Sequence, residues 1–127
     1  MGGKVTGLGG VFFKADDPKQ LHEWYERHLG LKQENGGVFF RWRDRDADTP
    51  GTTVWSIFPR DTSYFDPGKA PFMLNYRVDD LDAMLTRLRA DGVTVDDRRE
   101  DSEYGRFAWV MDLEGNRIEL WEPPKGT

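Results

Sequence analysis

The sequence contains no cysteine and only two histidines among its 127 residues. Without a thiol, the chain forms no disulfide, holds no thiolate-bound metal and has no cysteine nucleophile. His22 and His28 fall on one predicted helix but on different sides of its axis, because a helix turns once in about 3.6 residues. The two imidazoles are therefore not expected to bind a common metal ion.

The sequence also lacks an excess of positive charge and any long apolar run. Its formal net charge is −5 at pH 7, so no basic surface is available to neutralise phosphates. No segment approaches the ~20 apolar residues of a membrane helix, and no apolar stretch follows the first residues as in a signal peptide. We therefore expect a cytoplasmic protein with neither nucleic acid nor a membrane as a partner.

The first half of the sequence predicts one helix among four short strands. Asp17 and Pro18 are typical of a helix start, and Gly30 is typical of a helix end. A glycine-containing turn at 35–37 and a charged, proline-containing loop at 43–51 separate strand-favouring segments. The predicted helix covers residues 18–29, and the predicted strands cover residues 8–15, 31–34, 38–42 and 52–58.

The second half repeats the first after a segment rich in proline, residues 59–71. The residues FKADD at 13–17 match YRVDD at 76–80, and the last strands align Trp55 with Glu119. The predicted helix begins at Asp79-Asp80 and ends at Gly92. The predicted strands cover residues 72–78, 104–111 and 117–122, and a further strand starts at 93–95 and runs into an acidic stretch. Each half thus reads βαβββ, and neither is expected to bury enough surface alone.

Three segments carry a resemblance to a known family. They are VFFKADDPKQLHEWYERHLGLK, NYRVDDLDAMLTRLRADGV and YGRFAWVMDLEGNRIELWEPP. The chain resembles the vicinal oxygen chelate superfamily of glyoxalase, bleomycin-resistance and dioxygenase proteins. The resemblance implies an α+β fold in which two βαβββ modules form a curved, partly open mixed β-sheet barrel with helices outside. It also implies one domain over 1–127, with module 1 at about 6–58, a linker at 59–71 and module 2 at about 72–123.

The resemblance implies four metal-ligand positions, on the first and last strand of each module. On the family's spacing from the helix-opening aspartates, these positions are Gly10, Trp55, Met73 and Glu119. Glycine and tryptophan offer no donor atom, and a thioether is a poor ligand for hard divalent cations. Glu119 alone does not hold a metal ion against water. We therefore expect neither a metal nor another cofactor.

The alternation of side chains along strands predicts which residues face the cavity of this fold. Aromatic residues make up 13% of the chain, and some of them are expected to wall this cavity. Burial would raise the pKa of Glu119, which is either a general acid or base or a remnant of the metal site. The YFDPG segment at 64–68 is either a lid or a plain connector. The candidate ligand-binding residues are Phe12, Trp55, Met73, Asn75, Arg77, Tyr104, Arg106, Trp109, Glu119 and Trp121.

Four functions remain open from the sequence. The favoured one is a metal-independent, small-molecule-binding protein of the glyoxalase and bleomycin-resistance type. The second is a lyase, isomerase or hydrolase that uses Glu119 for proton transfer. A metal-dependent glyoxalase or dioxygenase is disfavoured by the missing ligands, and a structural dimer module without a ligand is the fourth. The open sheet edges predict a homodimer in each case.

Overall fold

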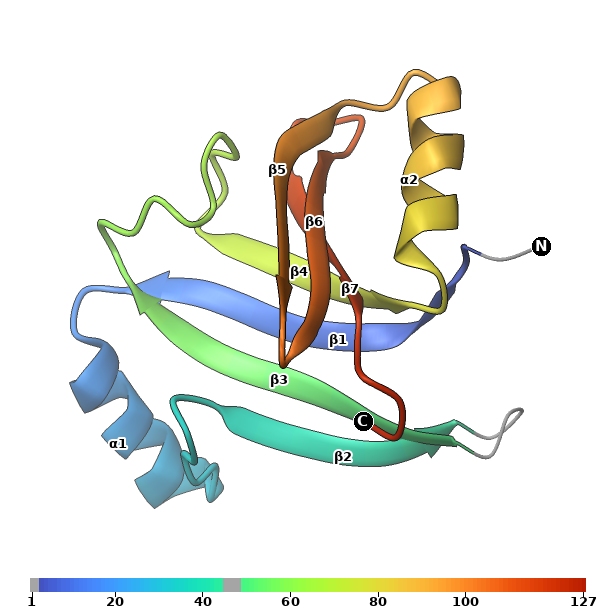
Figure 1. The fold of residues 1–127 in the computed structure, drawn as a ribbon. Coiled ribbons are helices and arrows are strands. Elements are labelled where there is room, and N and C mark those ends of the chain that lie inside the picture. Colours follow the sequence, from blue (N-terminus) through green and yellow to red (C-terminus); the bar gives the residue numbers. More distant parts are fainter. Residues whose placement is uncertain (1–2, 45–48) are drawn as a thin grey trace.

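The computed structural model describes residues 3–44 and 49–127, and Figure 1 shows two helices outside a single curved sheet. Within the described residues the sheet has seven strands in the order β2-β3-β1-β4-β7-β6-β5. The sheet is mixed and does not close, which confirms the predicted α+β fold class. The elements are β1 (Val5–Ala15), α1 (Pro18–Leu29), β2 (Val38–Asp44), β3 (Thr49–Pro59), β4 (Phe72–Val78), α2 (Leu81–Ala90), β5 (Val95–Ser102), β6 (Gly105–Met111) and β7 (Arg117–Glu122).

The two modules join through their first strands at the centre of the sheet. β1 and β4 are antiparallel, and Val11 pairs with Leu74. β3 runs parallel to β1 in module 1, as β7 runs parallel to β4 in module 2. β2 and β6 then continue the sheet with antiparallel pairing on the two sides. The modules therefore pair within one chain, about an approximate twofold axis between β1 and β4.

One predicted strand is missing from module 1. Residues 31–33 have no regular structure, and Glu34 forms only an isolated bridge with Gly37. This segment consists mainly of exposed polar residues and has no neighbouring strand. An extended backbone there would therefore form no inter-strand hydrogen bonds. The expected 43–51 loop is also shorter, because β2 extends to Asp44 and β3 begins at Thr49. Residues 45–48 of that expected loop lie outside the described residues.

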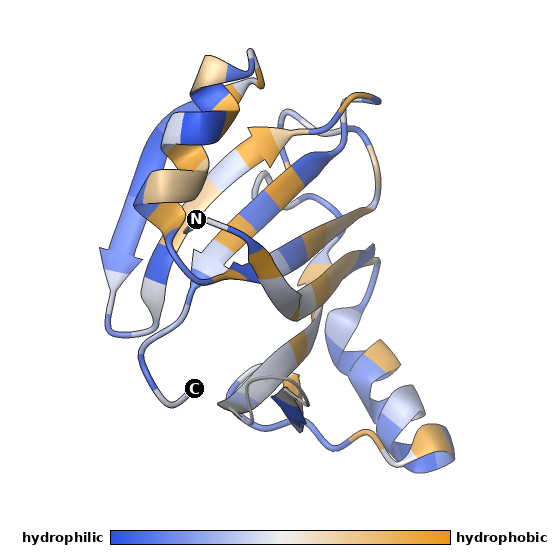
Figure 2. Cartoon of the chain, turned by 90° about the vertical axis from the view of Figure 1, so that its right-hand side faces the viewer, coloured by the Kyte–Doolittle hydropathy of each residue, from blue (hydrophilic) through white to orange (hydrophobic). Residues whose placement is uncertain are grey.

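Helix α2 covers the outer face of module 2. Asp80 caps its start, since the carboxylate accepts a hydrogen bond of 3.0 Å from the backbone N–H of Ala83. Hydrophobic and hydrophilic residues alternate along the strands in Figure 2, so one face of each strand can meet the helix. The core between helix and sheet contains Val78, Leu81, Met84, Leu85, Ala108, Val110 and Leu120.

Helix α1 is packed more loosely against module 1. Its capping by Asp17 and its end at Gly30, which has a left-handed φ of 70°, match the prediction. Trp24 and His28 of this helix are exposed, whereas His22 is buried. Its main packing partners among the described elements are β1 and β3. Neither α1 nor α2 has the length and apolar character of a membrane-spanning helix.

The segment between the modules enters the core. Phe65 is 1% exposed and packs with Phe12, Met73 and Trp109 on the concave side of the sheet. Phe12 belongs to module 1, whereas Met73 and Trp109 belong to module 2. The segment is therefore neither a lid nor a plain connector, because Phe65 anchors it in a core cluster shared by both modules.

Candidate functional site

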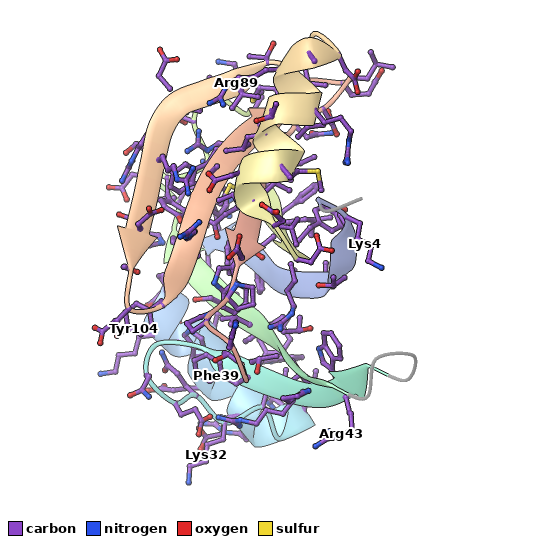
Figure 3. All side chains as sticks on the ribbon, turned by 45° about the vertical axis from the view of Figure 1, so that its right-hand side comes forward. Lys4, Lys32, Phe39, Arg43, Arg89 and Tyr104 are labelled. Atoms are coloured by element: carbon purple, nitrogen blue, oxygen red, sulfur yellow. The ribbon has the colours of Figure 1, made fainter. Side chains whose placement is uncertain are left out.

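The concave side of the sheet holds a cavity of about 600 Å³. Its walls come from both modules, including β2 and β3 on one side and β6, β7 and the β5–β6 turn on the other. Tyr104 at the β5–β6 turn and Phe39 on β2, both labelled in Figure 3, line the cavity from the two modules. The volume lies in the range typical of small-molecule sites.

Aromatic rings form much of the cavity wall. Phe107 and Trp121 stack with an interplanar angle of 5° and a centroid separation of 6.0 Å. Trp121 is held in place because its indole N–H donates to the backbone oxygen of Tyr104 at 2.8 Å. Such walls favour flat apolar ligands. The aromatic residues that line the cavity are Phe12, Phe39, Trp42, Tyr104, Phe107 and Trp121.

Glu119 lies at the cavity and is 1% exposed. Its Oε1 accepts a hydrogen bond of 2.6 Å from Nδ2 of Asn75, which is the paired residue on β4. Its Oε2 accepts from the indole N–H of Trp109 at 2.9 Å and from the hydroxyl of Tyr64. Three neutral donors therefore surround a single buried carboxylate.

Burial decides the titration of this group. Removal from water raises the pKa of Glu119, and the hydrogen bonds from Tyr64, Asn75 and Trp109 together with the charge of Arg117 oppose that rise only in part. Burial and the negative charge of Glu119 also raise the pKa of Tyr64, so its hydroxyl stays protonated and donates. The arrangement is one in which Glu119 can either accept hydrogen bonds or hold a proton beside the cavity.

Five of the candidate ligand-binding residues line the cavity, namely Phe12, Asn75, Tyr104, Glu119 and Trp121. Two more lie on the same face but behind the lining. Met73 and Trp109 are both 0% exposed and belong to the buried cluster with Phe65. Both residues pack in the core, and Trp109 also contacts the site through its hydrogen bond to Glu119 and its ring contact with Tyr64.

The two candidate arginines occupy different places. Arg77 is buried between Trp42 and Trp121, with its guanidinium 5.5 Å and 5.3 Å from the two ring centroids, and burial lowers its pKa. It lies next to two wall residues of the cavity. Arg106 instead pairs with Asp82 of α2 at 3.1 Å, so it faces the helix side and not the cavity.

Trp55 was expected in the cavity beside Glu119, and this expectation was wrong. Its ring contacts Phe13, His22 and Tyr25 on the α1 side of the sheet. The reason is a one-residue error in aligning the last strands. Trp55 pairs with Val11 and Ile118 pairs with Leu74, so the residue equivalent to Trp55 is Ile118. Glu119 is equivalent to Ser56, and a shift of one residue moves a strand side chain to the other face.

The expected metal-ligand positions do not converge. Glu119 lies beside Asn75, which pairs with Gly10 across the module boundary. Trp55, in contrast, points to the α1 side of the sheet, and Met73 lies in the core. Within residues 3–44 and 49–127, no three His, Asp or Glu side chains form a cluster that could hold a metal ion. Both oxygens of Glu119 already accept hydrogen bonds. The residues present therefore do not fit a resident divalent metal.

The other lining residues are absent from the candidate list, and four residues of the site show why. Phe39 and Trp42 are wall residues on β2, and Gly9 lies at an irregular pairing of β1 that brings it to the cavity. Tyr64 comes from the intermodule segment. The sequence offered one signal for Tyr64, namely that it and Phe65 are adjacent aromatic residues in an otherwise polar segment. It offered no signal for Gly9, because an irregular strand pairing cannot be read from the residues.

Comparison with known proteins gives a family and a fold. Residues 10–121 match the family model described as a glyoxalase-like domain. A search of curated proteins found no match. Together with the structural matches to methylmalonyl-CoA epimerases, the family match confirms the resemblance to the vicinal oxygen chelate superfamily.

Three solved structures illustrate the likeness. A methylmalonyl-CoA epimerase from Mycobacterium tuberculosis is 28% identical, with a TM-score of 0.61 over 96% of this chain and 91% of that one. A Streptomyces coelicolor methylmalonyl-CoA epimerase variant in complex with 2-nitronate-propionyl-CoA is 17% identical, with a TM-score of 0.69 over 94% and 99%. A structure named NAD-dependent benzaldehyde dehydrogenase, from Legionella pneumophila, is 12% identical, with a TM-score of 0.58 over 91% and 98%. The two structures of lower identity show the fold alone.

Proposed function

The chain belongs to the glyoxalase-like domain family, and from this premise we propose that it binds an apolar small molecule in the concave cavity without a metal ion. The observation that carries the proposal is the cavity of about 600 Å³, with aromatic walls and the buried pair Asn75 and Glu119. A few placed polar groups among apolar walls are typical of small-molecule sites.

The absence of suitable ligands supports the metal-independent part of the proposal. A divalent ion at Glu119 would need further donor atoms, and Gly10 and Val54, which pair with one another beside Asn75, supply none from their side chains. Metal analysis of protein purified without chelators tests this part. One tightly held transition-metal ion per chain would contradict it.

Native mass spectrometry of freshly purified protein tests the binding itself. We expect a retained small molecule, or saturable binding of apolar probes that shifts the amide resonances of cavity residues such as Val54 and Phe107. Probes that shift resonances only on the α1 side would place binding elsewhere. Trp24 is a suitable reporter for that outcome, since it is exposed on α1, which packs on β1 and β3, whereas Phe107 lies on β6.

A second candidate is an isomerase that uses Glu119 for proton transfer. Two observations favour it: burial raises the pKa of Glu119 beside the cavity, and the 28%-identical structure is named an epimerase. Hydrogen–deuterium exchange at the α-carbon of methylmalonyl-CoA in D₂O is the direct assay. Glu119→Gln should slow an acid–base reaction by about 10²-fold or more, whereas a binding protein should keep much of its affinity. Lyase and hydrolase chemistry at Glu119 would respond to this variant in the same way.

We also propose a homodimer. β2 and β5 are edge strands within the described sheet, and large apolar side chains such as Trp24, Leu29 and Phe40 are exposed on α1 and β2. Unpaired edges and apolar surface of this kind favour association with a second copy. Sedimentation at micromolar concentration is the measurement, and a monomer alone would contradict this proposal.

A further inference from the structure

The proton state of Glu119 depends on the protein groups around it, because the side chain has almost no contact with bulk water. Glu119 is 1% exposed, although it belongs to the cavity lining. A small molecule that fills the cavity would displace water from that side as well. When a buried carboxylate takes up a proton, its new O–H group needs an acceptor, since an unpartnered buried donor is costly. The groups in contact with Glu119 must therefore suit both its ionised and its protonated form.

Of the three groups that the described residues bring to this carboxylate, only one suits both forms. Nδ2 of Asn75 and the indole N–H of Trp109 donate hydrogen bonds to Glu119 and do not accept them. The hydroxyl of Tyr64 donates to Oε2, and its oxygen can also accept a hydrogen bond. Rotation of the hydroxyl hydrogen about the C–O bond changes Tyr64 from a donor to an acceptor, and the ring does not have to move.

The ring of Tyr64 is held in position by its neighbours. It stacks on Phe58 with an interplanar angle of 5° and a centroid separation of 5.5 Å. The ring of Trp109 is nearly perpendicular to it, at 87° and 6.2 Å. The next residue, Phe65, anchors the segment in the core. These contacts keep the hydroxyl beside Glu119, so a change of its hydrogen-bond direction needs no rearrangement of the segment.

Tyr64 keeps its own proton while Glu119 titrates. Burial raises the pKa of its hydroxyl, and the negative charge of Glu119 and the hydrogen bond to it raise that pKa further. The hydroxyl is therefore no competing base. Tyr64 acts on Glu119 through the hydrogen bond alone.

On the basis of the second candidate function, we infer that Tyr64 is the positioning residue for proton transfer by Glu119. Its hydroxyl donates to the carboxylate before the transfer and accepts from the carboxyl group after it. In the transfer, a C–H bond of the ligand breaks, its electron pair stays on the ligand, and the proton forms an O–H bond with Glu119. The reverse step returns a proton to the ligand, so no further reactant is needed. In D₂O, exchange of this O–H with solvent before the reverse step gives the deuterated ligand.

Tyr64→Phe is the direct test, because it removes the hydroxyl and keeps the ring. The titration midpoint of Glu119, followed by its carboxyl carbon resonance in the full chain, should rise, since the carboxylate loses a donor. Hydrogen–deuterium exchange at the α-carbon of methylmalonyl-CoA should slow by about 10-fold or more. The pH profile of this exchange should move to higher pH together with the midpoint. A residue that only supported the fold would move neither the midpoint nor the profile.

Tyr25→Phe is the matched control, because it removes the hydroxyl of another half-buried tyrosine, which contacts Phe13 and Trp55 on the α1 side. It should change neither the midpoint of Glu119 nor the exchange rate. An unchanged midpoint or an unchanged pH profile in Tyr64→Phe would overturn the inference and leave the isomerase candidate standing. A wild-type chain that exchanges no deuterium into methylmalonyl-CoA would contradict the isomerase candidate, and with it a role of Tyr64 in proton transfer.

Discussion

Glu119 shows how one residue can be foreseen from sequence while its neighbours are not. Its position on the last strand and its burial followed from the family pattern and from strand alternation. Its partners did not, because Tyr64 reaches it from a segment without periodicity and Asn75 meets it through the β4–β7 pairing. Contacts between distant segments depend on register, and register is set by the whole sheet.

The raised pKa of Glu119 predicts a specific pH dependence of stability. The ordinary pKa of a glutamate carboxyl is 4.5, and burial raises the pKa of Glu119 above it in the folded state. Below about pH 4.5 the carboxyl is protonated in both states, and as the pH rises it ionises first in the unfolded chain, which favours unfolding. The free energy of unfolding should therefore fall with rising pH relative to Glu119→Gln, which cannot ionise. Urea denaturation of both proteins from about pH 4 to about pH 8 measures the difference between their free energies of unfolding. A difference that stays constant over this range would contradict the prediction.

Trp55 should affect stability and not the cavity. Its half-buried ring packs against Phe13 and Tyr25, so Trp55→Ala should cost about 2 kcal/mol, below the range for a fully buried tryptophan. The affinity of cavity probes should stay unchanged, because Trp55 points to the α1 side. Phe107→Ala is the contrasting variant, since it removes part of the wall. Denaturation and probe titration of both variants separate the effect on stability from the effect on the cavity. A changed probe affinity in Trp55→Ala would instead support the predicted position of Trp55 in the cavity.

At the scale of elements, sequence predicted helices better than strands. Both helices have local signals, namely Asp17 and Asp80 at their starts and Gly30 after the first. A strand forms only if another strand offers its hydrogen bonds, and the expected strand at 31–34 has no such neighbour. The structural role of the segment at 59–71 was missed for a similar reason. Its aromatic residues Tyr64 and Phe65 pack in a core formed by strands distant in the sequence, which local patterns do not reveal.

Phe65 makes this segment part of the core, and its removal should be costly. Phe65→Ala should lower the free energy of unfolding by about 3–5 kcal/mol, as for other fully buried phenylalanines. Phe72→Ala is a matched control a few residues away, since Phe72 is 46% exposed and should cost much less. Chemical denaturation at fixed pH measures both variants. Similar costs would show that Phe65 is not anchored as described.

For the whole molecule, the pairing of modules predicts a single unfolding transition. β1 and β4 share the central pairing of the sheet, and the cluster of Phe12, Phe65, Met73 and Trp109 draws residues from both modules and the segment between them. Neither half keeps this cluster without the other. Far-ultraviolet circular dichroism and tryptophan fluorescence should therefore give coincident denaturation curves. Two separated transitions would indicate modules that fold independently.

The approximate twofold relation between the modules also has a consequence for how such a cavity can diversify. Phe12 and Ser56 occupy in module 1 the places that Asn75 and Glu119 occupy in module 2, yet only the second pair forms a buried carboxylate and amide. At these equivalent positions module 1 places a phenyl ring beside the cavity, whereas module 2 places a buried carboxylate and amide in addition to its own ring walls. Inherited changes in β2 and β3 can therefore alter the shape of one cavity wall while the polar pair on β4 and β7 is kept, so one module can change without rebuilding the other.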